Sequence, residues 1–296
     1  MPPAARLPFL ASIAPGCSRH LKTGKCVLAF ADIENGRLHY EVLGHGRPLF
    51  LVSGLGGVGE FWRAQAERLA RDFQVVLHDH RGTGRSETQT SDYTVELMAN
   101  DVLALMDHLG VERASIVGHS TGGIIAQTMA LTRPERVGDL VLSASWAHGD
   151  AYFRSLFGLR LAVLKGLGLE AYEQFGRLFR YPPWYFGEEP EALTPTVGES
   201  GSEEIIASRI GVLLDFDSRA ELPRISSRTL VIGAEDDAIT PRYLWNELAQ
   251  NIPNAVLTTL PTGGHFCPQT QPDLYHRHLH DFLVEGRMTS PAAAAS

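Results

Sequence analysis

Cysteine is scarce in this chain: only Cys17, Cys26 and Cys267 occur among 296 residues. An odd and sparse set does not suit a disulfide framework and is typical of proteins kept in a reducing compartment. The chain also has no apolar run that approaches the roughly 20 residues needed to span a bilayer. We therefore expect a cytoplasmic protein with no part in the membrane.

Positive charge is also in short supply. The chain has 26 Lys and Arg residues against 34 Asp and Glu residues, which gives a net charge of −8 at pH 7. No basic stripe stands out, so nucleic acid and anionic membranes are poor candidate partners. A hydrophobic content of 44% with 20% charged residues allows a large core without disulfides or metals. The composition favours a globular protein whose partner is a small molecule, and it leaves the oligomeric state open.

Short apolar strands alternate with helical patterns along most of the chain. The Asn35-Gly36 pair between two apolar runs indicates a hairpin at the start. Regular alternation after it predicts an α/β fold, with a mostly parallel twisted sheet and helices on both faces. The expected strands are 27–33, 38–43, 48–53, 74–79, 114–117, 137–143, 228–232 and 255–260, and the expected helices include 60–71, 95–109 and 123–131.

The alternation fails over residues 145–219, which are rich in aromatic residues and arginine. An insertion between two strands of such a sheet usually lies above the strand ends, where ligands bind. We interpret it as a helical cap on a core formed by residues 27–144 and 220–286; a helical subdomain without a role in substrate binding is the alternative. We expect residues 1–26 and 287–296 to be a disordered extension and a disordered tail.

Residues Gly118–Gly122 form a G-x-S-x-G motif between an expected strand and an expected helix. In that context the motif makes a sharp turn that holds the serine hydroxyl clear of the sheet. Ser120 is therefore the candidate nucleophile. The motif is short and common by chance, so an ordinary strand-to-helix turn that happens to contain a serine is the alternative.

A nucleophilic serine needs a base to take its proton and an acid to orient that base. Downstream of Ser120, an acidic run follows one expected strand and His265 follows the next. Both segments therefore lie at the edge of the sheet where Ser120 is expected. The acidic run offers Asp237, with Asp236 and Glu235 as the other possible acids.

At this point the chain resembles the α/β-hydrolase superfamily over roughly residues 27–285. The resemblance implies an α/β-hydrolase fold with a Ser120–His265–Asp237 triad. Asp237 is preferred because the acid in this superfamily usually stands four residues before a proline, here Pro241. The segments that carry the resemblance are Ser53–Gly57, Asp79–Ser86, Gly118–Gly122, Asp237–Pro241 and Gly263–His265.

The resemblance also implies an oxyanion hole made by the backbone N–H groups of Leu55 and Thr121. It implies no metal and no cofactor. Three histidines within 276–280 form an H-x-H-x-H pattern, which we interpret as the solvated flank of a helix rather than as a metal site.

A dinucleotide-binding loop is a second interpretation of the glycines at 54–59, which form G-x-G-x-x-G with Asp79 standing 20 residues later. We reject it because it leaves Ser120, Asp237 and His265 without a role. Asp79 is then expected to hold the turn that follows the fourth strand.

Within the superfamily the chain is most similar to small catabolic hydrolases. Segments 52–57 and 178–184 resemble those of the 3-oxoadipate enol-lactonases and of the aminoacrylate hydrolases of pyrimidine breakdown. Aminoacrylate-type relatives often lack the serine of the motif, whereas this chain has Ser120, which favours ester or lactone chemistry. We therefore expect a serine hydrolase that cleaves a small ester or lactone through an acyl-enzyme. A hydrolase of an amide, carbamate-type C–N or C–C bond is the first alternative, and a non-catalytic binding protein is the second.

The expected cap also supplies candidate substrate-binding residues. Arginines lie there among aromatic residues, and an arginine can hold a carboxylate with two parallel hydrogen bonds. The alternative is that these arginines pair with glutamates of the same segment. The residues singled out for substrate binding are Trp146, Arg154, Arg180 and Trp184.

Overall fold

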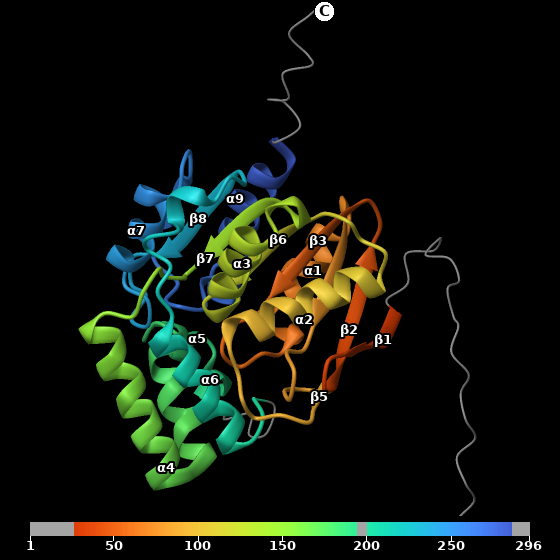
Figure 1. The fold of residues 1–296 in the computed structure, drawn as a ribbon. Helices are drawn as coiled ribbons and strands as arrows, with labels where there is room; N and C mark the ends of the chain where they lie inside the picture. The colour runs from red at the N-terminus through yellow and green to blue at the C-terminus, as the bar shows by residue number, and fades with distance from the viewer. Residues whose placement is uncertain (1–26, 194–199, 286–296) are drawn as a thin grey trace, which may run out of the picture.

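The computed structural model describes residues 27–193 and 200–285, so both expected terminal segments lie outside the described residues. These residues form one nine-stranded sheet with the order β1-β2-β4-β3-β6-β7-β8-β9, in which β5 pairs with β2 (Figure 1). The strands are β1 (Val27–Ile33), β2 (Gly36–Gly44), β3 (Arg47–Val52), β4 (Phe73–His78), β5 (Glu87–Thr88), β6 (Ala114–His119), β7 (Val137–Ser143), β8 (Thr229–Ala234) and β9 (Val256–Leu260).

The sheet begins antiparallel and becomes parallel. Strands β1 and β2 form the expected hairpin, in which Asn35 takes a positive φ of 56° at the turn. Asparagine tolerates this left-handed conformation better than most residues. From β4 to β9 every neighbouring pair is parallel. The predicted α/β architecture is therefore confirmed.

Helices cover both faces of the sheet. On one face α1 (Arg63–Leu69) and α9 (Pro272–Glu285) pack against the strands through a core that includes Trp62 and Tyr275. On the other face α2 (Val95–His108), α3 (Thr121–Thr132) and α7 (Arg242–Asn251) bury a second, larger core. The short elements are η1 (Gly59–Trp62), η2 (Pro134–Arg136), η4 (Leu222–Arg224) and α8 (Cys267–Thr270). None of the helices in the described ranges has the length and apolarity needed to cross a bilayer.

An inserted helical segment separates β7 from β8. It contains α4 (Ala151–Arg180), α5 (Tyr185–Glu188), η3 (Pro190–Leu193) and α6 (Glu203–Asp215). Figure 1 shows these helices grouped at one end of the molecule, beside the sheet rather than on either face. Helix α4 is kinked at Gly168, whose φ of 82° is accessible to glycine at little cost. The aromatic and arginine-rich sequence thus forms helices next to the strand ends.

The parallel strands bring the three candidate triad residues to one edge. Ser120 directly follows β6, while Asp237 and His265 lie in the loops that follow β8 and β9. Strands β6, β7, β8 and β9 are consecutive neighbours in the sheet. Their carboxyl ends therefore meet at the same edge, which is where ligands bind in open α/β sheets.

A buried histidine at the end of β4 makes the fold sensitive to acid. His78 stacks on His80 with ring centroids 5.3 Å apart, and burial lowers the pKa of His78 from 6.5 to about 4. The unfolded chain therefore takes up this proton at a higher pH than the folded protein does. We expect His78 alone to lower the free energy of unfolding by about 3 kcal/mol as the pH drops from 6.5 to about 4.

Urea unfolding of the wild type and of His78→Asn across that pH range tests this expectation. The wild-type free energy should fall more steeply with acid than that of His78→Asn, because the variant lacks the buried titrating ring. The exposed His45 provides a matched control, and His45→Asn should follow the wild-type profile. Parallel profiles for the wild type and His78→Asn would contradict the assignment.

Candidate active site

Ser120 lies at a strained turn between β6 and α3. Its backbone has φ 54° and ψ −117°, an unusual conformation for a residue with a side chain. Close packing enforces the turn, because a β-carbon at Gly118 would lie 2.1 Å from the carbonyl oxygen of Gly122. A β-carbon at Gly122 would lie 2.2 Å from the oxygen of Val52. The glycines of the motif therefore allow the chain to turn sharply, and the serine stands at its apex.

His265 is held by Asp237. The Nδ1 atom of His265 lies 2.9 Å from Oδ2 of Asp237, and both side chains are almost completely buried. The other carboxylate oxygen of Asp237 accepts hydrogen bonds from the backbone N–H groups of Ile239 and Thr240. The hydroxyl of Thr240 lies 2.8 Å from Oδ2 of Asp237. The carboxylate is thus fixed on all sides, and it orients the ring so that Nε2 is free for another partner.

The other two acids of the run have different partners. Asp236 accepts a hydrogen bond from the N–H of Gly264 at 2.8 Å and another from the hydroxyl of Thr262. It therefore anchors the loop that carries His265 instead of touching the ring. Glu235 forms an exposed ion pair with Arg242. Of the three acids that the sequence leaves open, only Asp237 contacts the imidazole.

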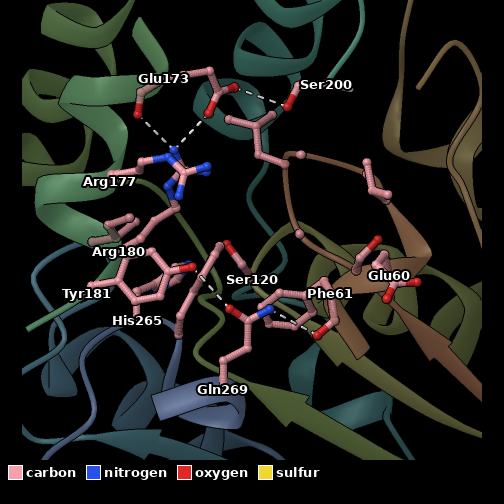
Figure 2. Close-up of a pocket in the computed structure, with 18 of the residues that line it drawn as sticks. Glu60, Phe61, Ser120, Glu173, Arg177, Arg180, Tyr181, Ser200, His265 and Gln269 are labelled. Atoms are coloured by element: carbon pink, nitrogen blue, oxygen red, sulfur yellow. Dashed lines mark hydrogen bonds and ion pairs between the residues drawn. The ribbon is translucent and has the colours of Figure 1, made fainter. Parts of the chain in front are cut away.

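A cavity of about 250 Å³ opens beside these residues and is lined by both Ser120 and His265 (Figure 2). Its walls combine the loop after β3, including Leu55, with residues of α4 and with Phe266. No hydrogen bond joins the hydroxyl of Ser120 to His265 within the described ranges. Such contacts are commonly long before substrate binds. The arrangement places a nucleophile and a base at the wall of a space suited to a small molecule.

Two backbone N–H groups lie next to the nucleophile. Thr121 begins helix α3, and the first amide of a helix has no partner inside that helix. Leu55 lies in a tight turn in which the N–H of Gly57 bonds to the oxygen of Gly54 at 3.0 Å. Neither Leu55 nor Thr121 donates its N–H to another described residue. Neither amide is thus engaged within the described part of the chain, and their role as oxyanion donors stays a prediction.

His119 lies beside the site without the contacts of a base. Its ring centroid lies 4.9 Å from that of His265 and 4.7 Å from that of Phe61, on which it stacks. Its Nδ1 bonds to Ser143, and burial lowers the pKa of His119 well below its ordinary value. The ring is therefore neutral and packs behind His265.

The structure places the four expected substrate-binding residues differently. Arg180 lines the cavity. Trp146 is fully buried and packs on Phe153, because the apolar core under α4 encloses its ring. Arg154 is exposed on the outer side of α4 and donates to the oxygen of Gly149.

Trp184 is 36% exposed and donates its Nε1–H to the hydroxyl of Thr262. Trp146, Arg154 and Trp184 are thus outside the cavity, and their expected role in substrate binding finds no support there.

Three residues near the site lie outside the set that the sequence singles out for catalysis or substrate binding. Thr240 reaches Asp237, the oxygen of Ala144 and the ring of His265. Arg160 and Glu173, both on α4, line the cavity with almost no exposure to solvent. Thr240 lies in Asp237–Pro241, one of the segments that carry the resemblance, so the sequence did indicate that it is near the site. Nothing in the sequence distinguishes Arg160 from the exposed arginines of the same helix.

The glycine loop at 54–59 has a structural partner in Asp79. The buried Asp79 carboxylate accepts hydrogen bonds from the N–H groups of Gly59 and Arg85, at 2.8 and 3.0 Å. Asp79 thus holds the turn after β4, as expected, and does not point to a nucleotide. Within the described ranges, no group of three or more His, Cys, Asp or Glu residues is arranged to hold a metal ion.

Comparisons with known proteins agree with this geometry. A family model described as alpha/beta hydrolase fold matches residues 47–198, and one described as TAP-like protein matches residues 214–294. A protein of Azorhizobium caulinodans with the name "Putative carbamate hydrolase RutD" is 38% identical over 262 residues, which cover 87% of this chain and 99% of the relative. A protein of the same name from Caulobacter vibrioides is 36% identical over 83% of this chain and 95% of the relative.

A solved structure, the enol-lactonase from Burkholderia xenovorans LB400, has a TM-score of 0.81 at 27% identity and covers 87% of this chain and 100% of its own. A hydrolase from Pseudomonas aeruginosa has a TM-score of 0.77 at 29% identity, over 87% of this chain and 98% of its own. The family matched and the curated relatives together establish that this chain belongs to the alpha/beta hydrolase family and is a hydrolase.

Proposed function

We propose that this hydrolase cleaves a C–N bond next to a carbonyl group, of the carbamate or amide type, in a small molecule. The contact that carries the catalytic part of the proposal is the bond from His265 Nδ1 to Asp237, beside Ser120 in one cavity. The choice of bond is supported by relatives of up to 38% identity whose name describes a carbamate hydrolase. This choice replaces the ester or lactone expected from the sequence, which becomes the second candidate.

The site provides each group that the reaction needs. His265 Nε2 takes the proton of Ser120 while Oγ attacks the carbonyl carbon. The carbonyl oxygen becomes an oxyanion, and the N–H groups of Leu55 and Thr121 stabilise it. Asp237 keeps the proton of His265 on Nδ1 and stabilises the imidazolium.

Collapse of this intermediate needs a proton on the leaving nitrogen, since an amide anion is a poor leaving group. His265 gives the proton from Nε2 to that nitrogen, the C–N bond breaks and the amine departs. The carbonyl group stays attached to Ser120 as an ester. Water then attacks this ester, with His265 as the base, and Ser120 is regenerated.

Ester or lactone cleavage is the second candidate because this chain is similar to the enol-lactonase structure. The match covers 100% of the enol-lactonase chain, with a TM-score of 0.81. The same groups serve both reactions. The difference lies in the leaving atom, because an oxygen leaves with less help from a proton than a nitrogen does.

A matched pair of small substrates separates the two candidates. Ethyl acetate and N-ethylacetamide share their acyl and alkyl groups and differ only in the leaving atom; methyl N-ethylcarbamate adds the carbamate group. We expect ethylamine release from the amide or the carbamate, with a rate enhancement over spontaneous hydrolysis at least equal to that for ethyl acetate. Hydrolysis of ethyl acetate alone would instead support the second candidate.

A further inference from the structure

The active-site cavity carries more positive than negative charge. Three arginines of α4 line it, namely Arg160, Arg177 and Arg180. Two carboxylates line it as well, and one of them, Glu60, is largely exposed and is held by Arg63 outside the cavity at 3.0 Å. The cavity therefore has a local excess of positive charge in a chain whose net charge is −8. Such a field attracts an anion.

Arg180 is already neutralised by a glutamate. Its Nη2 donates to a carboxylate oxygen of Glu173 at 2.8 Å and to the backbone oxygen of the same residue at 2.9 Å. The other carboxylate oxygen of Glu173 accepts a hydrogen bond from Ser200. Figure 2 shows this network above Ser120 in the view. Pairing with a glutamate, the alternative left open by the sequence, therefore applies to Arg180.

Arg160 has no carboxylate bonded to it among the described residues. It is only 5% exposed, and its single hydrogen bond within the described ranges goes from Nη2 to the hydroxyl of Tyr172 at 2.8 Å. Its Nε is buried without an acceptor there. The aromatic rings of Phe157 and Tyr172 lie 5.1 and 4.7 Å from the guanidinium carbon, and they offset part of the cost of burying the charge. Burying a cation without a carboxylate bonded to it is costly, and because Arg160 lines the cavity an anionic ligand there could offset that cost.

The guanidinium groups of Arg160 and Arg180 lie close to each other beside Gly176 of α4. A β-carbon at Gly176 would lie 3.1 Å from the Nη2 atoms of both Arg160 and Arg180. The guanidinium of Arg180 also lies 5.6 Å from the ring centroid of Phe266, the residue after His265. Like charges held this close repel each other, and burial and Arg180 together lower the pKa of Arg160. Tyr172 and the nearby carboxylate of Glu173 offset only part of that effect on the pKa. An anion between them would relieve that repulsion.

We propose that Arg160, together with Arg180, forms a carboxylate-binding subsite, so that the substrate is a small molecule carrying a carboxylate as well as the carbonyl group that Ser120 attacks. This inference rests on the proposed function and adds the substrate class. A guanidinium suits a carboxylate because it can donate two parallel hydrogen bonds, and the aromatic walls strengthen them by excluding water. Arg160 is the residue that selects the anion, while Glu173 keeps Arg180 in place.

Labelling of Ser120 with matched probes tests the subsite without the natural substrate. We would use alkyl fluorophosphonates of graded short chain length, each made with a terminal carboxylate and as the corresponding methyl ester. In the wild type, the best carboxylate probe should label Ser120 about 30-fold faster or more than its methyl ester, as expected for a buried charge pair. In Arg160→Met, the ratio of the two labelling rates should fall towards one.

Arg154 provides the matched control, because it is an arginine of the same helix outside the cavity. Arg154→Met should keep the wild-type ratio. If Arg160→Met does not fold, Arg160→Lys replaces it; lysine keeps the charge but not the two parallel donors, and the ratio should still fall several-fold.

The outcomes separate the two proposals. Equal labelling by both probes in the wild type, or an unchanged ratio in both Arg160 variants, would overturn the carboxylate subsite alone. Failure of the neutral probes to label Ser120 in the folded wild type would instead contradict the proposed function.

Discussion

Replacement of Ser120 by alanine is expected to lower kcat by about 10⁴- to 10⁶-fold, the loss seen when a triad member is removed from a serine hydrolase. The reason is that no other described side chain in the cavity combines a hydroxyl at a strained turn with a buried histidine and carboxylate behind it. Alanine removes only the oxygen, so the glycine packing that forms the turn remains. Steady-state kinetics on whichever small substrate the wild type cleaves best measures the effect.

A serine on the strand that precedes the nucleophile gives the matched control. Ser115 lies on β6, five residues before the nucleophile and away from the cavity. Ser115→Ala should retain wild-type kinetics, and both variants should unfold within a few degrees of the wild type. A folded Ser120→Ala protein with a rate near that of the wild type would exclude the proposed mechanism.

Asp237→Asn is expected to be the second most damaging change, with a loss of about 10⁴-fold in kcat, by analogy with the corresponding change in a serine protease. When the NH₂ group of an asparagine faces the ring, it donates a hydrogen bond and cannot accept one from Nδ1–H. His265 would then hold its proton on Nε2, where it cannot accept the proton of Ser120. Asp237 is only 4% exposed, so bulk water has little access to replace the lost acceptor.

Asp236→Asn is the natural control, because it makes the same chemical change one residue earlier. Asp236 anchors Gly264 and Thr262 and does not touch the ring, so its loss should loosen the loop and cost far less activity. Comparison of kcat for Asp237→Asn and Asp236→Asn shows which of the two carboxylates orients His265. If Asp236→Asn proved the more damaging, the acid would have to be reassigned.

Much of this architecture follows from local rules that the sequence displays. The G-x-S-x-G motif demands a sharp turn because side chains at Gly118 or Gly122 would collide with backbone oxygens. Apolar runs bounded by loops define the parallel strands, and the parallel arrangement brings their carboxyl ends together. Position in the sheet thus predicts that Ser120 and His265 meet. Strand β5 is only two residues long and has no pattern of its own.

The choice among the three neighbouring acids required the three-dimensional structure. Asp236 and Asp237 differ by one position, and one residue is enough to turn a side chain in another direction. The carboxylate of Asp237 is captured by the N–H groups of Ile239 and Thr240, which leaves its second oxygen for His265. These backbone contacts depend on the path of the loop, which residue types alone do not determine.

The inserted helices were the hardest part to interpret, because an aromatic or arginine residue in a helix can face the core, the solvent or a ligand. On α4, Phe153 faces the core and Arg154 faces solvent, whereas Arg160, six residues further along, faces the cavity. The kink at Gly168 changes the direction of the helix, so a regular helical period does not carry through from one half to the other. Only the packing reveals that Arg160 lines the cavity with no carboxylate bonded to it among the described residues.

The most direct test of the central claim is to label the folded wild-type protein with a small neutral fluorophosphonate and to locate the adduct by mass spectrometry of its peptides. The mechanism predicts one adduct per chain, on Ser120, with its formation strongly slowed in Asp237→Asn. An adduct on another residue, or no adduct on a protein that hydrolyses its substrate, would contradict the assignment of Ser120 as the nucleophile.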